Sequence, residues 1–141
     1  MAFIYYLTQI HLDFGTVSML PAECERVGMK RPLIVTDAGV RAAGVLALAE
    51  AALGDVPHAV FDGTPSNPTE AGVRAATAIY KAQKCDGLIA VGGGSSIDLA
   101  KGVAIAATHE GPLKTYATIE GGSPKITERV APLIAVPTTA G

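Results

Sequence analysis

Short runs of aliphatic and β-branched residues alternate with longer, alanine-rich runs, and this alternation limits the fold more than any other feature of the sequence. The apolar runs predict strands, and the helical spacing of apolar residues between them predicts helices. The predicted strands are 33–36, 58–61, 87–91 and 133–136, and the predicted helices are 37–53, 69–84 and 96–108. Gly54 is expected to end the first helix. Strands and helices in this order give an open parallel α/β sheet with right-handed crossovers.

The remaining segments are assigned from weaker patterns. We expect a short helix at 112–117 and an exposed loop or hairpin at 121–129. Near the N-terminus, 3–7 and 10–14 are predicted as a pair of strands outside the parallel unit, which form a hairpin or pair with another subunit. The 141 residues, 49% of them hydrophobic, suit one compact domain with its own core.

Composition argues against several functional classes. The net charge is −2 and no run of Lys or Arg is present, so a nucleic-acid-binding surface is not expected. No stretch is long and apolar enough to cross a membrane, and the N-terminus lacks the basic start of a signal peptide. Cys24 and Cys85 lie far apart without metal-ligand spacing, which indicates reduced thiols in a cytoplasmic protein.

The strongest local signal is a triple glycine, Gly92–Gly94, between the predicted strand 87–91 and the helix after it. Glycine allows a phosphate to approach the backbone, and free N–H groups at a helix start bind anions. Ser95 and Asp98 have the spacing of a capping box. A tight strand-to-helix turn without a ligand explains the same residues. The pattern is neither G-x-G-x-x-G nor a P-loop.

Three further signals also follow predicted strands. Asp37 is suited to bind a ribose diol and repel a 2′-phosphate, or simply to cap a helix. Asn67 either caps the helix that Pro68 begins or reaches a nucleotide. The hydroxyls of Thr138 and Thr139 bind phosphate, ribose or amide groups, or serve as turn residues. Because parallel strands end at one edge of a sheet, a single extended ligand explains all four signals together.

The order and spacing of these motifs resemble those of the iron-containing (type III) alcohol dehydrogenases. The resemblance is carried by Gly92-Gly93-Gly94-Ser95-x-x-Asp98-x-Ala100-Lys101, Asn67-Pro68-Thr69, Val35-Thr36-Asp37-x-Gly39 and Pro137-Thr138-Thr139-Ala140-Gly141. The last of these is similar to the beginning of a longer threonine- and glycine-rich motif in that family.

The resemblance implies a Rossmann-like domain, of the dehydroquinate synthase-like kind, that binds NAD in preference to NADP. Asp37 would then hold the adenosine ribose, the glycines and Ser95 the pyrophosphate, and the two threonines the adenine or phosphate side. The implied cofactor-binding residues are Asp37, Asn67, Gly92, Gly93, Gly94, Ser95, Asp98, Thr138 and Thr139. Lys101 is interpreted as a structural partner of Asp98.

In such a family, a second, helical domain supplies an Asp and three His that bind Fe²⁺ or Zn²⁺, which polarises the alcohol as hydride passes to the nicotinamide. His11, His58 and His109 match no such ligand motif, so neither metal ligands nor catalytic residues are expected in this chain. We therefore expect residues 1–141 to be an NAD(P)-binding domain truncated inside its last motif, and inactive alone. The metal-binding domain and most of the substrate pocket would be missing.

For the intact protein, the resemblance implies a cytoplasmic oxidoreductase that interconverts a primary alcohol or diol with an aldehyde. It also implies a homodimer formed through the N-terminal strands, with no nucleic-acid or membrane partner. Two alternatives remain open. One is a related glycerol or polyol dehydrogenase, or another enzyme of this fold. The other is a non-catalytic nucleotide-binding or dimerisation module.

Overall fold

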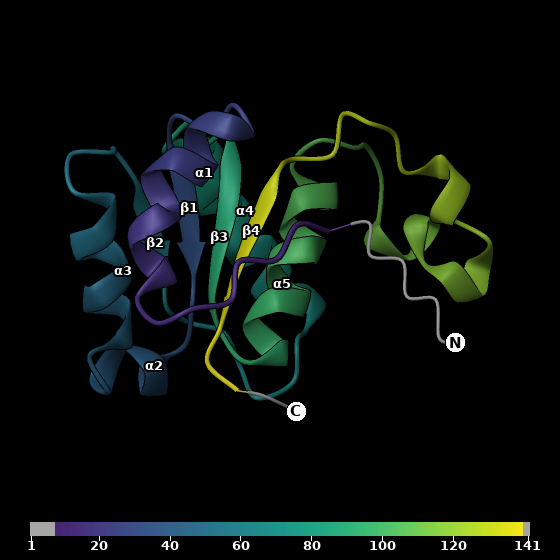
Figure 1. Ribbon diagram of the computed structural model, residues 1–141. Helices are drawn as coiled ribbons and strands as arrows, with labels where there is room; N and C mark the ends of the chain where they lie inside the picture. The colour runs from purple at the N-terminus through teal and green to yellow at the C-terminus, as the bar shows by residue number, and fades with distance from the viewer. Residues whose placement is uncertain (1–7, 140–141) are drawn as a thin grey trace, which may run out of the picture.

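A four-stranded parallel sheet forms the centre of the computed structural model, which describes residues 8–139 (Figure 1). Its strands are β1 (Pro32–Val35), β2 (Ala59–Phe61), β3 (Gly87–Gly92) and β4 (Leu133–Pro137), in the order β2-β1-β3-β4. Every pairing is parallel. The predicted open parallel α/β sheet is therefore confirmed.

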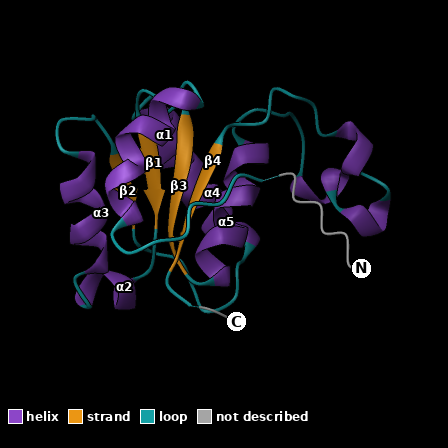
Figure 2. Cartoon of the chain, in the orientation of Figure 1, coloured by secondary structure: helices purple, strands orange, loops and turns teal. Residues whose placement is uncertain are grey.

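Helices cover both faces of the sheet, as the purple ribbons on either side of the orange strands show (Figure 2). The helices are α1 (Leu20–Arg26), α2 (Ala38–Ala42), α3 (Val45–Leu53), α4 (Glu70–Ala82) and α5 (Gly94–Ala106). Short 3₁₀ turns are η1 (Thr16–Met19), η2 (Leu113–Tyr116), η3 (Thr118–Glu120) and η4 (Ser123–Lys125). The pair α1 and α3 packs on one face, and α4 and α5 pack on the other.

The side chains of strand β3 contribute to two apolar cores, one on each face of the sheet. Leu88 and Ala90 belong to the apolar cluster formed with α4 and α5, whereas Ile89 and Val91 belong to the cluster formed with α1 and α3. All four side chains are fully buried. Successive residues of a strand point to opposite faces, so a continuous apolar run is needed when helices cover both faces.

The helix predicted over 37–53 is two helices, and Gly44 separates them. Gly44 has a φ of 82°, a left-handed conformation that glycine adopts without the steric cost of a side chain. Gly54 follows the end of α3, as the sequence predicted. Helix α1 was not predicted, although Pro21 in its first turn and the buried pair Leu20 and Cys24, four residues apart, are signals typical of a helix.

The strand predicted at 10–14 does not form within the single chain, and its pairing with another subunit stays a prediction. Residues 10–14 contain no strand, because no segment within residues 8–139 pairs with their backbone. The other predicted strand, 3–7, lies outside the described residues. Within the described range, no helix combines the length and apolar character needed to span a bilayer.

The segment after α5 is a loop rather than a hairpin. The short helix expected at 112–117 is present as η2, and 121–129 contains the turn η4 but no strand. His109 attaches this loop to the end of α5, because its Nε2 accepts a 2.9 Å hydrogen bond from the N–H of Thr127.

Candidate functional site

An open cleft of about 750 Å³ lies where the carboxyl ends of the strands meet. Segments that follow all four strands line it: 37–40 after β1, 64–66 after β2, 93–95 after β3 and 138–139 after β4. The geometry therefore gathers four distant parts of the chain at one edge of the sheet. This is the edge at which open α/β folds bind ligands.

Six of the nine residues singled out from the sequence line this cleft, namely Asp37, Gly93, Gly94, Ser95, Thr138 and Thr139. Gly92 lies at the end of β3, beside the cleft. Its φ is 156°, and a Cβ built on it would lie only 2.7 Å from Ser96 Oγ and 3.0 Å from Ser96 Cβ. A side chain at this position would therefore force the start of α5 to shift. Asn67 and Asp98 are exposed and do not line the cleft.

Helix α5 starts directly from the glycine turn, without a side-chain cap. Gly93 is the N-cap residue, and no side chain bonds the first amides of the helix. A helix of 13 residues that starts in this way presents N–H groups and the positive end of its dipole to the cleft. These groups are suited to bind an anion.

The capping box predicted from Ser95 and Asp98 is absent, because the helix begins before Ser95. The Ser95 hydroxyl instead donates a 2.5 Å hydrogen bond to the carbonyl of Ser66, which ties α5 to the loop after β2. Asp98 Oδ1 lies 3.5 Å from Lys101 Nζ, and both side chains are largely exposed. The interpretation of Lys101 as a partner of Asp98 is confirmed.

Asp37 caps helix α2 and also lines the cleft. Its Oδ1 accepts a 2.8 Å hydrogen bond from the N–H of Val40. Its Oδ2 lies towards β3, 3.6 Å from the position a Cβ of Gly92 would occupy. The capping interpretation is therefore confirmed, and one carboxylate oxygen is still directed away from the cap.

The interpretation of Asn67 as a helix cap is wrong. Helix α4 begins at Glu70, and its cap is Thr69, whose Oγ1 accepts a 3.0 Å hydrogen bond from the N–H of Gly72. Pro68 accordingly precedes the cap and does not open the helix. Helix α4 begins two residues after Pro68 because the side-chain oxygen of Thr69, rather than that of Asn67, bonds a free amide of its first turn.

The sequence analysis missed the contribution of the loop after β2. Thr64, Pro65 and Ser66 line the cleft. The Thr64 side chain is only 8% exposed, and its hydroxyl bonds no protein group within residues 8–139. Its N–H donates a 3.3 Å hydrogen bond to the Thr36 carbonyl, which positions it at the cleft wall. The rule that singled out Asp37, that ligand residues follow parallel strands, points to Thr64 as well.

The residues present fit a dinucleotide. Uncapped amides and two glycines are suited to the pyrophosphate, and a Cβ at Gly94 would meet nothing within 4 Å, so the space above it is open. Asp37 adds a carboxylate oxygen that is suited to the sugar.

The described residues do not fit a catalytic metal. No three His, Cys, Asp or Glu side chains come together anywhere in residues 8–139. The histidines are used separately: His11 contacts Glu23, His58 contacts Glu50 and the Val56 carbonyl, and His109 contacts the loop at Thr127.

Comparison with known proteins gives one consistent family. Residues 8–141 match the model of the family described as iron-containing alcohol dehydrogenase. A 4-hydroxybutyrate dehydrogenase from Cupriavidus necator is 70% identical over 141 residues, which is the whole chain and 37% of that protein. A 1,3-propanediol dehydrogenase from Klebsiella pneumoniae is 39% identical over 136 residues, which is 90% of the chain and 33% of that protein. The chain thus spans about a third of the length of the curated relatives it matches.

Two solved structures have the same fold as this chain, which covers about a third of each of them. A 1,3-propanediol oxidoreductase superposes with a TM-score of 0.80 at 38% identity, over 90% of this chain and 33% of that one. An NADH-dependent butanol dehydrogenase from Thermotoga maritima gives 0.84 at 25% identity, over 99% of this chain and 35% of that one.

Proposed function

Because the chain belongs to the iron-containing alcohol dehydrogenase family, we propose that it is the NAD-binding part of a metal-dependent enzyme that interconverts a primary alcohol or diol with an aldehyde. The observation that carries this proposal is the cleft at the carboxyl edge of the sheet, into which the uncapped start of α5 opens. The relative with 70% identity makes 4-hydroxybutyrate, itself a primary alcohol, the first substrate to test.

The role of this chain in that reaction is to bind and orient the cofactor, whose nicotinamide supplies the hydride acceptor when bound. We assign the pyrophosphate to the amides of Gly93, Gly94 and Ser95, and the adenine or phosphate side to Thr138 and Thr139. We assign the ribose diol to Asp37 and the support of the glycine turn to Gly92. Asn67, which follows the cleft residue Ser66, and Asp98, three residues after Ser95, are assigned peripheral contacts.

NAD is proposed in preference to NADP because of the charge at Asp37. Its free carboxylate oxygen is suited to accept hydrogen bonds from a ribose diol and to repel a 2′-phosphate. The structural relative from Thermotoga maritima is described as NADH-dependent, which supports the same choice.

The Fe²⁺ or Zn²⁺ of the intact enzyme would be bound by residues outside those the structure describes, since residues 8–139 contain no ligand set. Alone, this chain is therefore expected to show no dehydrogenase activity. The test is to mix it with NAD⁺, 4-hydroxybutyrate or 1,3-propanediol, and either metal, and to follow NADH absorbance. The full-length 4-hydroxybutyrate dehydrogenase of Cupriavidus necator serves as the positive control. Metal-dependent formation of NADH by the chain alone would contradict the proposal that the metal is bound by residues outside those the structure describes.

A homodimer through the N-terminal segment is proposed from its exposed apolar residues. Ile10, Leu12 and Phe14 are 66%, 95% and 103% exposed and alternate with polar residues in the sequence, a pattern suited to pairing with another chain. Deleting residues 1–12 and measuring the mass in solution tests this, and an unchanged dimer would contradict it.

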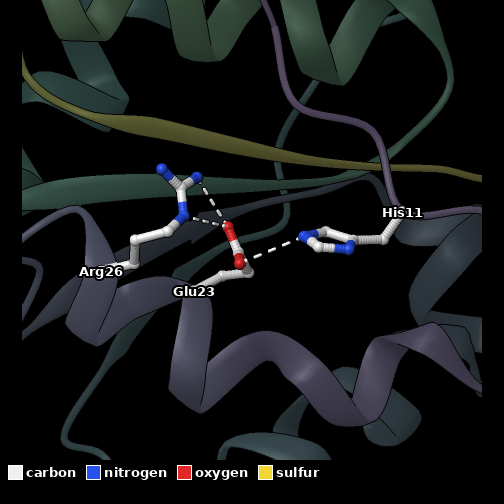
Figure 3. Close-up of polar contacts among 3 residues, drawn as sticks. All are labelled: His11, Glu23 and Arg26. Carbon is white, nitrogen blue, oxygen red and sulfur yellow. Dashed lines mark hydrogen bonds and ion pairs between the residues drawn. The ribbon is translucent and has the colours of Figure 1, made fainter.

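The same segment is attached to α1 by a small polar cluster (Figure 3). His11 Nε2 lies 3.1 Å from Glu23 Oε1, and Arg26 Nε donates a 2.8 Å hydrogen bond to Glu23 Oε2. The Arg26 guanidinium holds the pKa of Glu23 below its usual value, so Glu23 remains a charged acceptor at neutral pH.

A cytoplasmic location is also proposed, because Cys24 and Cys85 are both free and buried. Burial raises the pKa of both thiols, which keeps them protonated and poorly reactive. Labelling the native protein with a thiol reagent tests whether both thiols are protected. Rapid modification of both cysteines before unfolding would contradict that protection.

A further inference from the structure

An ion pair beside the cleft joins the segments that follow β1 and β2, and it includes none of the nine cofactor-binding residues predicted from the sequence. Arg41 Nη1 lies 2.5 Å from Asp62 Oδ2. Arg41 is part of α2, next to the cleft residue Val40 and two residues before the cleft residue Ala43. Asp62 lies two residues before the cleft residue Thr64, and neither Arg41 nor Asp62 itself lines the cleft. The pair thus bridges the two cleft segments that follow β1 and β2.

This pair stands on the same side of the cleft as Asp37. The main-chain N–H of Arg41 donates a 3.1 Å hydrogen bond to the carbonyl of Asp37, the N-cap residue of α2, so the two residues lie one helical turn apart. If the adenosine ribose binds at Asp37, as proposed above, its 2′-position faces this part of the rim. Two carboxylates, Asp37 and Asp62, and one guanidinium, Arg41, lie in these two segments, and Asp62 engages the guanidinium.

We infer that the Arg41–Asp62 pair is a second determinant of cofactor choice, which disfavours NADP beyond the effect of Asp37. A guanidinium is the usual partner of a 2′-phosphate, because its planar N–H groups match phosphate oxygens. Here a 2′-phosphate has to compete with Asp62 for Arg41. This inference rests on the proposed function, since it requires the ribose at Asp37.

The pair can be altered without undermining the fold. The Arg41 and Asp62 side chains are 61% and 44% exposed, and exposed ion pairs contribute little to folding stability. Asp62→Asn removes the carboxylate charge and keeps the size of the side chain. Asp55→Asn is the matched control, because Asp55 is an exposed aspartate after α3, at the opposite edge of the sheet.

The experiment measures the Kd of NADPH and of NADH for the wild-type chain and each variant at one low salt concentration. Asp62→Asn is expected to lower the ratio of NADPH Kd to NADH Kd by about two- to fivefold relative to wild type and to Asp55→Asn. Adding Arg41→Ala to Asp62→Asn is expected to abolish that gain, because the freed guanidinium is the source of it.

The outcomes separate this inference from the function on which it rests. An unchanged ratio in Asp62→Asn, with NADH still bound, overturns the inference and leaves the proposed function intact. A gain that persists without Arg41 overturns the role given to the guanidinium. A wild-type chain that binds neither dinucleotide overturns the proposed function itself.

Discussion

Gly94→Ala is expected to weaken NADH binding by about ten- to hundredfold while slightly stabilising the fold. The added methyl group would stand in the open space above the first turn of α5, where the pyrophosphate is proposed to approach the amides. Loss of hydrogen bonds to a charged group costs about 1.5–3 kcal/mol, which corresponds to that range in Kd. Because no protein atom lies within 4 Å of the new Cβ, the substitution creates no clash.

The opposite signs of the two effects make this test specific. Replacing glycine by alanine within a helix raises stability by roughly 0.5–1 kcal/mol. If the melting temperature of Gly94→Ala is unchanged or higher, its weaker NADH binding is therefore not caused by unfolding. Lys101→Ala, an exposed change later in the same helix, is the control and is expected to leave the NADH Kd as it is. Wild-type affinity in Gly94→Ala would contradict the assignment of the phosphate site.

Leu88→Ala is expected to lower the free energy of unfolding by about 2–5 kcal/mol. Leu88 is fully buried in the central strand β3, within the cluster formed with α4 and α5, so its removal leaves a cavity that the close-packed neighbours fill only in part. Urea unfolding measures the change.

The same substitution on the surface provides the comparison. Leu48 in α3 is 62% exposed, and Leu48→Ala is expected to change stability by no more than about 0.5 kcal/mol. A loss below roughly 1 kcal/mol at Leu88 would contradict the placement of β3 between two helical layers.

The sheet was predictable because its central strand is apolar at consecutive positions. Leu88 and Ile89 point to opposite faces, and only a strand covered on both sides needs both to be apolar. The break at Gly44 was not predictable in the same way, since the surrounding alanines and leucines favour a continuous helix and one glycine costs only about 1 kcal/mol. The left-handed turn at Gly44 places α3 against α1, a tertiary constraint that local periodicity does not contain.

The place of the candidate site was predictable from topology, whereas its side-chain bonds were not. Parallel strands bring Asp37, Gly94 and Thr138 to one edge whatever their separation in the sequence, and all three line the cleft. Which residue caps a helix depends on the residue at which the helix begins. Shifts of one or two residues therefore replaced Asn67 by Thr69 and turned Ser95 from a cap into a bond to the neighbouring loop.

Titrating the isotopically labelled chain with NADH, while following its backbone amide signals, tests the central claim most directly. Binding at the glycine turn predicts saturable shifts of the Gly93, Gly94, Ser95 and Ser96 amides, while residues 113–125, in the loop after α5, stay unchanged. If millimolar NADH leaves those four amides where they were, this chain does not hold a dinucleotide at the start of α5.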